Sequence, residues 1–156
     1  MKKVYYSYND FLEDSKILLK QIRDYEPDAL VPVARGGLAL GQMIGEALDT
    51  REVYSINSIL YEDTKKLEKS KVFNVPNLSK VKKVVLIDDI VDSGESMKHI
   101  LAKLKKKFPH CKFKIATLFY KQTACLQPDF TVREAKEWIE FFWEVDLLDK
   151  IKMTEK

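Results

Sequence analysis

Hydrophobic and polar positions alternate along this chain with two periods, one helical and one extended, and together they predict its elements. Phe11, Leu18 and Ile22 recur at helical spacing after Ser7 to Asp10, a segment that resembles a helix N-terminal cap. Runs rich in branched apolar residues indicate strands between the helical stretches. In chain order, the pattern predicts strands at 29–33, 53–60, 84–88 and 113–120, with helices at 38–48 and 95–108.

Strands that alternate with helices are typical of an α/β fold, in which helices flank a mostly parallel, twisted sheet. We therefore expect a single domain over residues 1–156, with ligands bound beyond the carboxyl ends of the strands. Pro32 lacks a backbone N–H, which argues against a fully paired central position for its strand. Residues 61–77 are polar, rich in lysine and without a period, so we expect a long loop there.

Composition and charge limit the classes of protein to consider. The net charge is +3 with acids and bases interspersed, so solvated lysines are favoured over a basic patch for nucleic acid. The basic start lacks the apolar segment of a signal peptide, and no apolar run reaches membrane-spanning length. Cys111 and Cys125 have no metal-type spacing, which predicts reduced thiols, no zinc and a cytoplasmic protein.

The segment 84–96 carries the most informative chemistry in the chain. Its apolar run reads as a buried strand, and two adjacent carboxylates, Asp88 and Asp89, follow that run directly. A phosphate needs several backbone N–H groups aimed at one point, and small residues such as Gly94 permit that close approach. Serine hydroxyls add donors at the start of the next helix. The polar loop consists of Asp92, Ser93, Gly94, Glu95 and Ser96.

The two adjacent carboxylates need a different ligand, because they would repel a phosphate. Carboxylate oxygens accept hydrogen bonds from vicinal hydroxyls and coordinate hard divalent cations. The sequence therefore predicts a ribose 5′-phosphate site, with the phosphate in the loop, the 2′ and 3′ hydroxyls on Asp88 and Asp89, and Mg²⁺ nearby. The alternative is an ordinary strand–loop–helix crossover whose acids and serines only cap and turn the chain.

A second candidate anion site follows the first predicted strand. Arg35, Gly36 and Gly37 open the helix expected at 38–48. Glycine permits backbone conformations that other residues resist, and the forked guanidinium of arginine suits phosphate. Alone, this segment would indicate a tight turn with a surface arginine, but together with the phosphate loop it becomes a second phosphate-binding candidate.

Residues 119–146 are the candidate for binding a planar heterocycle. Such a ligand needs a stacking face, with donors and acceptors at its edge. Trp138 offers the face, Lys121 a donor for an exocyclic carbonyl and Ile139 a backbone group. The alternative is an aromatic core segment with an exposed lysine, and this alternative is favoured for the aromatic residues at 141–143.

Residues 86–96 resemble the phosphoribosyl pyrophosphate (PRPP) motif of type I phosphoribosyltransferases, with two acids, two apolar residues and a short acid–hydroxyl–glycine loop. The resemblance implies that Asp88 and Asp89 fix the ribose, that Asp89 also serves Mg²⁺, and that the Arg35-Gly36-Gly37 turn holds pyrophosphate. It assigns the 5′-phosphate to the polar loop of Asp92, Ser93, Gly94, Glu95 and Ser96. It also implies a flexible loop at about 61–77 that closes over the reaction centre.

That flexible loop departs from the family pattern at its start. Related enzymes often have Ser-Tyr there, whereas this chain has Leu60-Tyr61. Lysines in the loop are expected to supply positive charge to the departing pyrophosphate, and closure would exclude water. The departure leaves open which loop residues meet the pyrophosphate.

A lysine followed about seventeen residues later by Trp-Ile-Glu resembles the bacterial xanthine–guanine phosphoribosyltransferases within this family. The resemblance spans residues 35–146. It implies that Lys121 contacts the purine 6-oxo group, that Trp138 stacks on the base, and that Ile139 contacts the base through its main chain. These residues would lie in a small C-terminal hood, the base-binding region at about 119–146.

The implied reaction transfers ribose 5-phosphate from PRPP to N9 of guanine, xanthine or hypoxanthine and releases pyrophosphate. Arg35 and Mg²⁺ would neutralise the leaving group, and Asp92 would assist proton loss through the N7 edge of the purine. The resemblance also implies a homodimer or homotetramer. The sequence leaves open the preferred purine, the subunit number and the role of the C-terminal tail.

A PRPP-sensing regulator of the same fold, which binds nucleic acid without turnover, is the alternative function. The intact Arg35-Gly36-Gly37, together with Asp92, favours an enzyme, as do Lys121 and Trp138. The chain also offers no evident second domain for DNA binding. An enzyme acting on orotate or uracil is a further alternative, and the residues of the base region argue against it.

Overall fold

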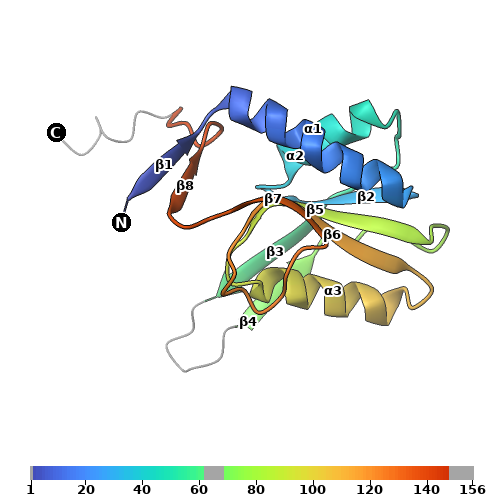
Figure 1. Cartoon of the computed structure of the whole chain (residues 1–156). Coiled ribbons are helices and arrows are strands. Elements are labelled where there is room, and N and C mark those ends of the chain that lie inside the picture. The colour runs from blue at the N-terminus through green and yellow to red at the C-terminus, as the bar shows by residue number, and fades with distance from the viewer. Residues whose placement is uncertain (1, 62–68, 148–156) are drawn as a thin grey trace.

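The computed structural model describes residues 2–61 and 69–147, which form one α/β domain (Figure 1). Helices and strands alternate along most of the chain, as the hydrophobic pattern predicts. In chain order the elements are β1 (Lys3–Tyr6), α1 (Tyr8–Tyr25), β2 (Ala29–Ala34), α2 (Leu38–Ala47), β3 (Ile56–Tyr61), β4 (Lys69–Phe73), β5 (Lys83–Val91), α3 (Glu95–Lys107), β6 (Lys112–Tyr120), β7 (Phe130–Glu134) and β8 (Trp138–Phe141).

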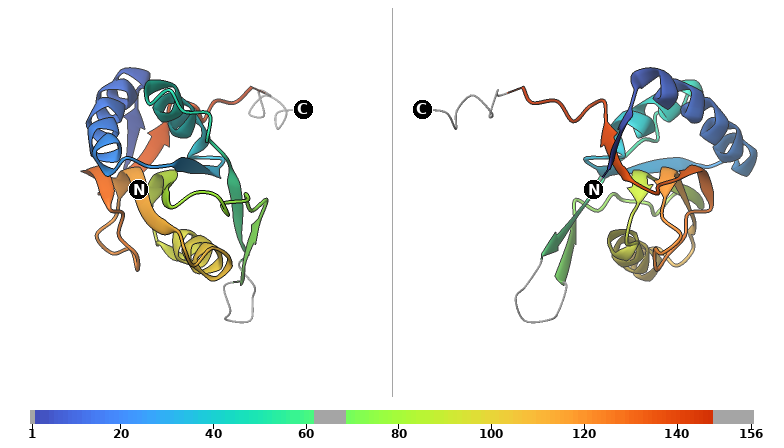
Figure 2. Two further views of the ribbon diagram at one scale, coloured as in Figure 1. Left: turned by 90° about the vertical axis from the view of Figure 1, so that its right-hand side faces the viewer. Right: turned by 60° about the vertical axis from the view of Figure 1, so that its left-hand side comes forward.

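Six of these strands build the main sheet, in the order β4-β3-β2-β5-β6-β7. The β3–β4 pair is antiparallel, and the other pairs of this sheet are parallel. Helices α1 and α2 cover one face of the sheet and α3 covers the other (Figure 1, Figure 2). The predicted fold, a mostly parallel sheet flanked by helices, is confirmed.

The apolar run of β5 forms the centre of two hydrophobic cores. Val85 and Ile87 face the core under α1 and α2, whereas Val84 and Leu86 face the core over α3. This division follows from the alternation of side chains along a strand. All four side chains are fully buried, so β5 is fixed from both sides and can hold the residues at its carboxyl end in place.

Local signals place the ends of α1 and α3 as the sequence predicts. Ser7 Oγ accepts a hydrogen bond from Asp10 N at 3.1 Å, and Asp10 Oδ2 accepts one from Ser7 N at 3.3 Å. This capping box starts α1. Helix α3 ends at Lys107, shortly before Pro109, because proline disfavours helical conformation in the residue before it.

Strand β5 is longer than predicted because of its neighbour in the sheet. We expected β5 to end at the acids, but it continues to Val91, since β6 pairs with it that far. The prediction for β2 is confirmed in that its pairing is incomplete. Its ladder with β3 consists of Val33, Ala34 and an isolated bridge from Leu30, and is interrupted at Pro32.

The long loop predicted at 61–77 is partly wrong, because Lys69–Phe73 forms β4 and pairs antiparallel with β3. Val72 of this strand is buried against the core over α3, which explains why the segment is ordered as a strand. The flexible-loop prediction falls mainly on residues 62–68, which lie outside the described residues.

A second, two-stranded sheet forms the hood, which we define as β1 and β8. The strands run parallel, with Lys3 opposite Trp138 and Tyr6 opposite Phe141. The hood lies beside the main sheet at the amino end of α1 (Figure 1, Figure 2). The sequence predicted a base-binding hood near the C-terminus but did not predict β1, the strand that completes it.

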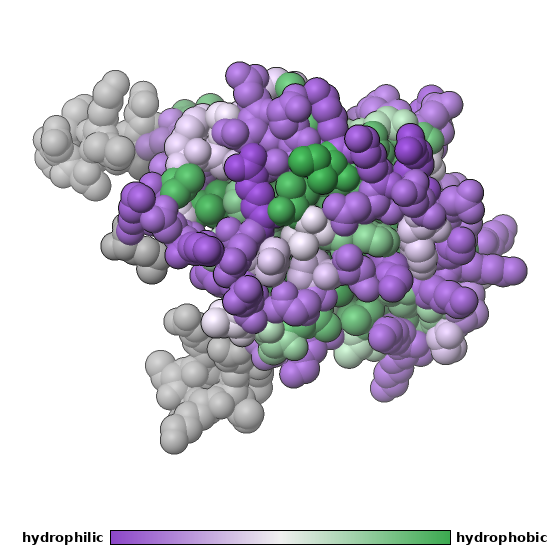
Figure 3. All heavy atoms as spheres, viewed as in Figure 1, coloured by the Kyte–Doolittle hydropathy of each residue, from purple (hydrophilic) through white to green (hydrophobic). Residues whose placement is uncertain are grey.

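The surface agrees with the interspersed charges of the sequence. The face in Figure 3 is mostly hydrophilic, with smaller apolar patches between charged side chains. None of the described helices combines the length and the apolarity that a membrane crossing requires.

Candidate active site

The end of β5 and the start of α3 form the predicted phosphate loop. Gly94 has a φ of 84°, and an added Cβ would lie 2.8 Å from Leu126 N, so this position requires glycine. As the N-cap of α3, Gly94 has no side chain to cap the N–H groups of the first turn. Ser93 Oγ accepts a hydrogen bond from Glu95 N at 3.3 Å. Helix N–H groups around a small-residue turn are suited to bind an anion.

Asp88 and Asp89 lie side by side within the last part of β5. Asp88 Oδ1 accepts a hydrogen bond from Asp89 N at 2.9 Å. Burial, and then the charge of Asp89, raise the pKa of Asp88 well above its usual value. Burial likewise raises the pKa of Asp89, and the charge of Glu144 adds to the effect. Two partly buried acids at one point favour a ligand that brings a cation or hydroxyl donors.

The turn of Arg35, Gly36 and Gly37 lies directly against β5. The peptide bond that precedes Arg35 is cis. A Cβ added to Gly36 would lie 2.3 Å from Asp89 Oδ2, and one added to Gly37 would lie 2.2 Å from Ile87 O. The close approach of the two backbones therefore requires glycine at Gly37, whereas a side chain at Gly36 would displace the carboxylate of Asp89.

Replacing Gly37 tests that close approach. Because the new methyl group would meet a backbone carbonyl that cannot rotate away, Gly37→Ala is expected to lower the free energy of unfolding by about 1–3 kcal/mol. Urea unfolding followed by circular dichroism measures this change. Leu38→Ala is the control, since Leu38 is 42% exposed, and its effect is expected to stay near 0.5 kcal/mol, a value typical of surface sites. Equal stability of Gly37→Ala and the unmodified protein would contradict the packing.

Lys121 and Asp92 form an ion pair, with 2.6 Å between Nζ and Oδ1. Each residue follows a strand directly, and the preceding residues, Tyr120 and Val91, are partners in the β5–β6 ladder. Lys121 N also donates to Val91 O at 3.0 Å. The parallel register thus places a cationic donor beside an anionic acceptor at the sheet edge.

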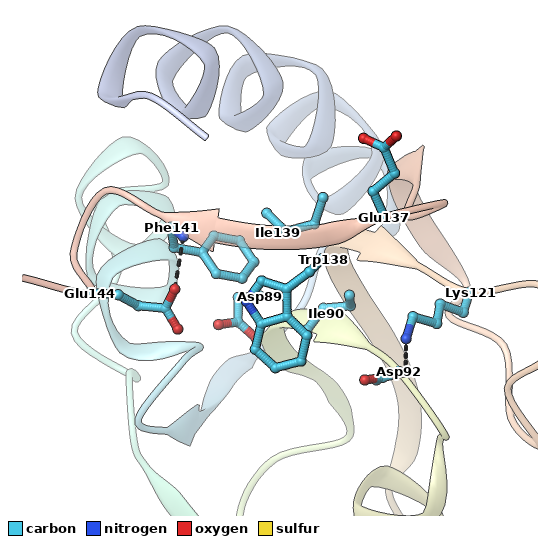
Figure 4. Close-up of a pocket in the computed structure, with 9 residues that line it drawn as sticks. All are labelled: Asp89, Ile90, Asp92, Lys121, Glu137, Trp138, Ile139, Phe141 and Glu144. Carbon is cyan, nitrogen blue, oxygen red and sulfur yellow. Dashed lines mark hydrogen bonds and ion pairs between the residues drawn. The ribbon is translucent and has the colours of Figure 1, made fainter. Parts of the chain in front are cut away.

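That ion pair faces the hood across a cavity of about 180 Å³, which we call the base cavity (Figure 4). Trp138, Ile139 and Phe141 of β8 line it on the hood side. The indole of Trp138 extends from β8 toward the cavity (Figure 4) and is 49% exposed. An open aromatic face opposite a donor–acceptor pair is suited to stack a planar ring and to bind its edge.

Three cavities meet at the end of β5 and share their walls. The phosphate-loop cavity of about 300 Å³ and the glycine-turn cavity of about 700 Å³ have Asp88 and Ser96 in common. The base cavity shares Asp89 with the glycine-turn cavity and Asp92 with the phosphate-loop cavity. The two predicted anion sites and the predicted base site are therefore contiguous.

Most of the predicted site residues line these cavities, and two do not. Gly37 is buried beneath its turn, and Glu95 begins α3 without lining any of the three. The predicted residues that line the cavities are Arg35, Gly36, Asp88, Asp89, Asp92, Ser93, Gly94, Ser96, Lys121, Trp138 and Ile139.

Sequence reasoning missed several residues that line this site, among them Ser58 and Glu144. Ser58 of β3 lines the glycine-turn cavity, and its buried Oγ has no hydrogen-bond partner within the described chain. Glu144 lines both the glycine-turn and base cavities, and its Oε2 accepts a hydrogen bond from Phe141 N at 3.0 Å. Ser58 is the third residue of β3, and a single serine inside a strand gave no signal in the sequence. Glu144 follows the aromatic run and carried no signal either.

Known proteins share both this sequence pattern and this fold. A family model for the phosphoribosyl transferase domain matches residues 5–150. The solved structure of Helicobacter pylori xanthine-guanine-hypoxanthine phosphoribosyltransferase is 42% identical, with a TM-score of 0.87, over 97% of this chain and 99% of that one. Xanthine-guanine phosphoribosyltransferase of Roseobacter denitrificans is 25% identical over 94% of this chain and 88% of its own length.

A regulator is also among the relatives. The transcriptional regulator GfcR of Methanococcus maripaludis is 32% identical, but the similarity covers 58% of this chain and 44% of the regulator. The family match covers nearly the whole domain and includes the phosphate loop, the glycine turn and strand β8 of the hood. The chain therefore belongs to the type I phosphoribosyltransferase family, and within that family it is similar to the bacterial xanthine–guanine phosphoribosyltransferases.

Proposed function

We propose that this protein transfers ribose 5-phosphate from PRPP to N9 of a 6-oxopurine, namely guanine, xanthine or hypoxanthine, and releases pyrophosphate. The contiguity of the three cavities is the observation that carries the proposal. A pyrophosphate, a ribose 5-phosphate and a purine must meet at one carbon atom, and each cavity offers the chemistry that one of these groups needs.

The phosphate-loop cavity would hold the 5′-phosphate on the N–H groups of the loop and of the first turn of α3, with Ser93 and Ser96 as additional donors. Asp88 and Asp89 would accept hydrogen bonds from the 2′ and 3′ hydroxyls of the ribose. In the glycine-turn cavity, Arg35 would donate to the pyrophosphate.

The acids at the end of β5 fit Mg²⁺. Among the described residues there is no group of three or more side chains that could hold a metal by themselves. Mg²⁺ commonly binds one or two carboxylates together with substrate phosphates, which suits Asp89 and its neighbour Asp88. When bound there, the ion would supply positive charge against the leaving pyrophosphate.

Positioning and charge stabilisation would then drive the reaction. Lys121 would donate to the 6-oxo group of the purine, and Asp92 would accept the proton at the N7 edge beside it. The 2.6 Å pair between them supports these roles, because the 6-oxo and N7 positions of a purine are adjacent on one edge. Trp138 would stack on the ring, and the main chain of Ile139 would contact it.

The direct test is a panel of purines assayed with PRPP and Mg²⁺ at matched concentrations, with nucleotide formation followed by absorbance. We expect turnover with at least one of guanine, xanthine and hypoxanthine, and none with orotate or uracil. Absence of nucleotide from every 6-oxopurine would overturn the proposal.

Lys121→Met tests the assigned base contact. Loss of a charged hydrogen bond to the 6-oxo group is expected to raise KM for the purine by roughly 10- to 100-fold, with KM for PRPP nearly unchanged. Steady-state kinetics with each substrate varied in turn measures both constants. Lys114→Met is the matched control, because Lys114 lies at the other end of β6 and pairs with Asp129 at 3.1 Å. A purine KM equal to that of the control would remove Lys121 from the base site.

A PRPP-sensing regulator remains the second candidate, and the GfcR similarity is the observation that favours it. Salt-sensitive binding of nucleic acid without turnover would support it over the enzyme. Homodimer or homotetramer assembly also stays a prediction, which light scattering would check. The cytoplasmic location likewise stays a prediction, which fluorescent tagging in cells would test.

A further inference from the structure

The hood carries one wall of the base cavity but shares no ladder with the main sheet. Within the described chain, β8 pairs with β1 alone, and the two strands form a separate sheet. Trp138, Ile139 and Phe141 nevertheless have to face Lys121 and Asp92, which are held by the main sheet. The width of the base cavity therefore depends on what fixes β1 to the rest of the domain.

A polar network around a buried carboxylate, completed by the half-exposed Arg133, makes that connection at the end of β1. The hydroxyl of Tyr6 donates to Asp14 Oδ2 at 2.7 Å. Arg133 donates to both oxygens of the same carboxylate, from Nε to Oδ2 at 2.7 Å and from Nη2 to Oδ1 at 3.0 Å. Tyr6 belongs to β1, Asp14 to α1 and Arg133 to β7, so the network joins the hood to helix α1 and to the main sheet.

The carboxylate at the centre of this network is almost inaccessible to solvent. Asp14 is 2% exposed and Tyr6 is 3% exposed. A buried charge is tolerated when it is paired and hydrogen-bonded, and removal of one partner leaves it unsatisfied. A second carboxylate, Asp10, lies 3.9 Å from Arg133 and adds to the charge that holds the guanidinium. The network therefore resists displacement of Tyr6.

The ring of Tyr6 packs against residues from both walls of the base cavity, so its fixed position also fixes those walls. It packs edge-on against Phe141 of β8, with 5.8 Å between ring centroids, and against Phe119 of β6, at 4.9 Å. Phe141 lines the base cavity, and Phe119 lies two residues before Lys121 on the strand that ends at the ion pair. Packed aromatic rings do not deform continuously, so a shift of Tyr6 would move one wall relative to the other.

We propose that Tyr6, Asp14 and Arg133 are positioning residues for purine binding, because they set the distance between the stacking face on β8 and the Lys121–Asp92 pair. The inference rests on the proposed function for its substrate. These three residues do not contact the purine themselves, and they do not position the end of β5 that would bind PRPP.

Tyr6→Phe is the sharpest test, because it keeps the packed ring and removes the single hydrogen bond. We expect KM for the purine to rise about 5- to 10-fold, while KM for PRPP changes less than about twofold. We also expect faster hydrogen–deuterium exchange at the backbone amides of residues 138–141. Arg133→Lys, which keeps the charge but loses the bidentate fork, is expected to act in the same direction.

Tyr25→Phe is the matched control. It removes a tyrosine hydroxyl from the other end of α1, where Tyr25 donates to Lys112 O at 3.2 Å, far along β6 from the base cavity. Its purine KM and its amide exchange at residues 138–141 are expected to equal those of the unmodified protein.

A general structural role predicts a different result. If Tyr6→Phe only lowered Tm, with purine KM and exchange at 138–141 unchanged, the inference would be overturned, as it would by an equal rise of both KM values. If the unmodified protein formed no nucleotide, the proposed function would fail separately. Exchange at 138–141 would then still decide whether the network fixes β8.

Discussion

Asp92→Asn is expected to lower kcat for nucleotide formation by about 10²–10⁴-fold, the contribution typical of a positioned acid–base group. The asparagine can still occupy the site, but it cannot take a proton from the N7 edge of the purine. Because PRPP contacts are assigned mainly to Asp88, Asp89 and the loop amides, KM for PRPP should change little. Steady-state and single-turnover kinetics separate the two constants.

Asp129→Asn is the control for this substitution. Asp129 is another partly exposed carboxylate paired with a lysine of β6, at 3.1 Å from Lys114, outside the three cavities. Its kcat should equal that of the unmodified enzyme. If Asp92→Asn kept full turnover, Asp92 would have no part in proton transfer, and its pairing with Lys121 would be structural.

Asp88→Asn is expected to weaken PRPP binding by roughly 10- to 100-fold, as loss of a charged hydrogen bond to ribose predicts, and also to stabilise the unliganded protein. Burial and the neighbouring Asp89 raise the pKa of Asp88, so its ionised form is disfavoured in the fold. The asparagine removes that charge and can still accept the hydrogen bond from Asp89 N. Each kcal/mol gained would raise Tm by about 2–4 °C in a domain of this size.

The raised pKa of Asp88 also predicts how the stability of the folded protein changes with pH. The folded protein binds a proton at Asp88 more tightly than the unfolded chain, whose carboxyl groups titrate near a pKa of about 4. The contribution of Asp88 to stability is therefore full below that pH, and it is lost as pH rises through the raised pKa. Urea unfolding across this range should show a shallower decline for Asp88→Asn. Parallel profiles for both proteins would contradict the raised pKa.

Features encoded by neighbouring residues could be predicted from the sequence. The capping box of Ser7 and Asp10 and the apolar period of α3 each depend on contacts within a few residues. The phosphate loop was recognisable for the same reason, since Asp88 to Ser96 is one uninterrupted segment. Its partners in the other two cavities were predicted from residue chemistry and from resemblance together, and the parallel register of β5 and β6 explains why Lys121 meets Asp92.

Features that depend on distant pairing could not be predicted in this way. The pairing of β1 with β8, and the contact of Arg133 with Asp14, join segments more than 100 residues apart. The four residues of β1 have mixed polarity, and the segment is too short to show the alternation that identifies a strand. Likewise, β4 becomes a strand because β3 offers it a partner and α3 a core for Val72.

The parallel pairing of β1 with β8 also fixes the order in which a newly made chain acquires its parts. A ribosome releases β1 long before β8, and the glycine turn and phosphate loop are made in between. Closing so long a loop is entropically costly, which delays the contact further. A nascent chain therefore assembles the surface for the sugar phosphate first, and during that interval the free edge of β1 is open to chaperones or to mispairing.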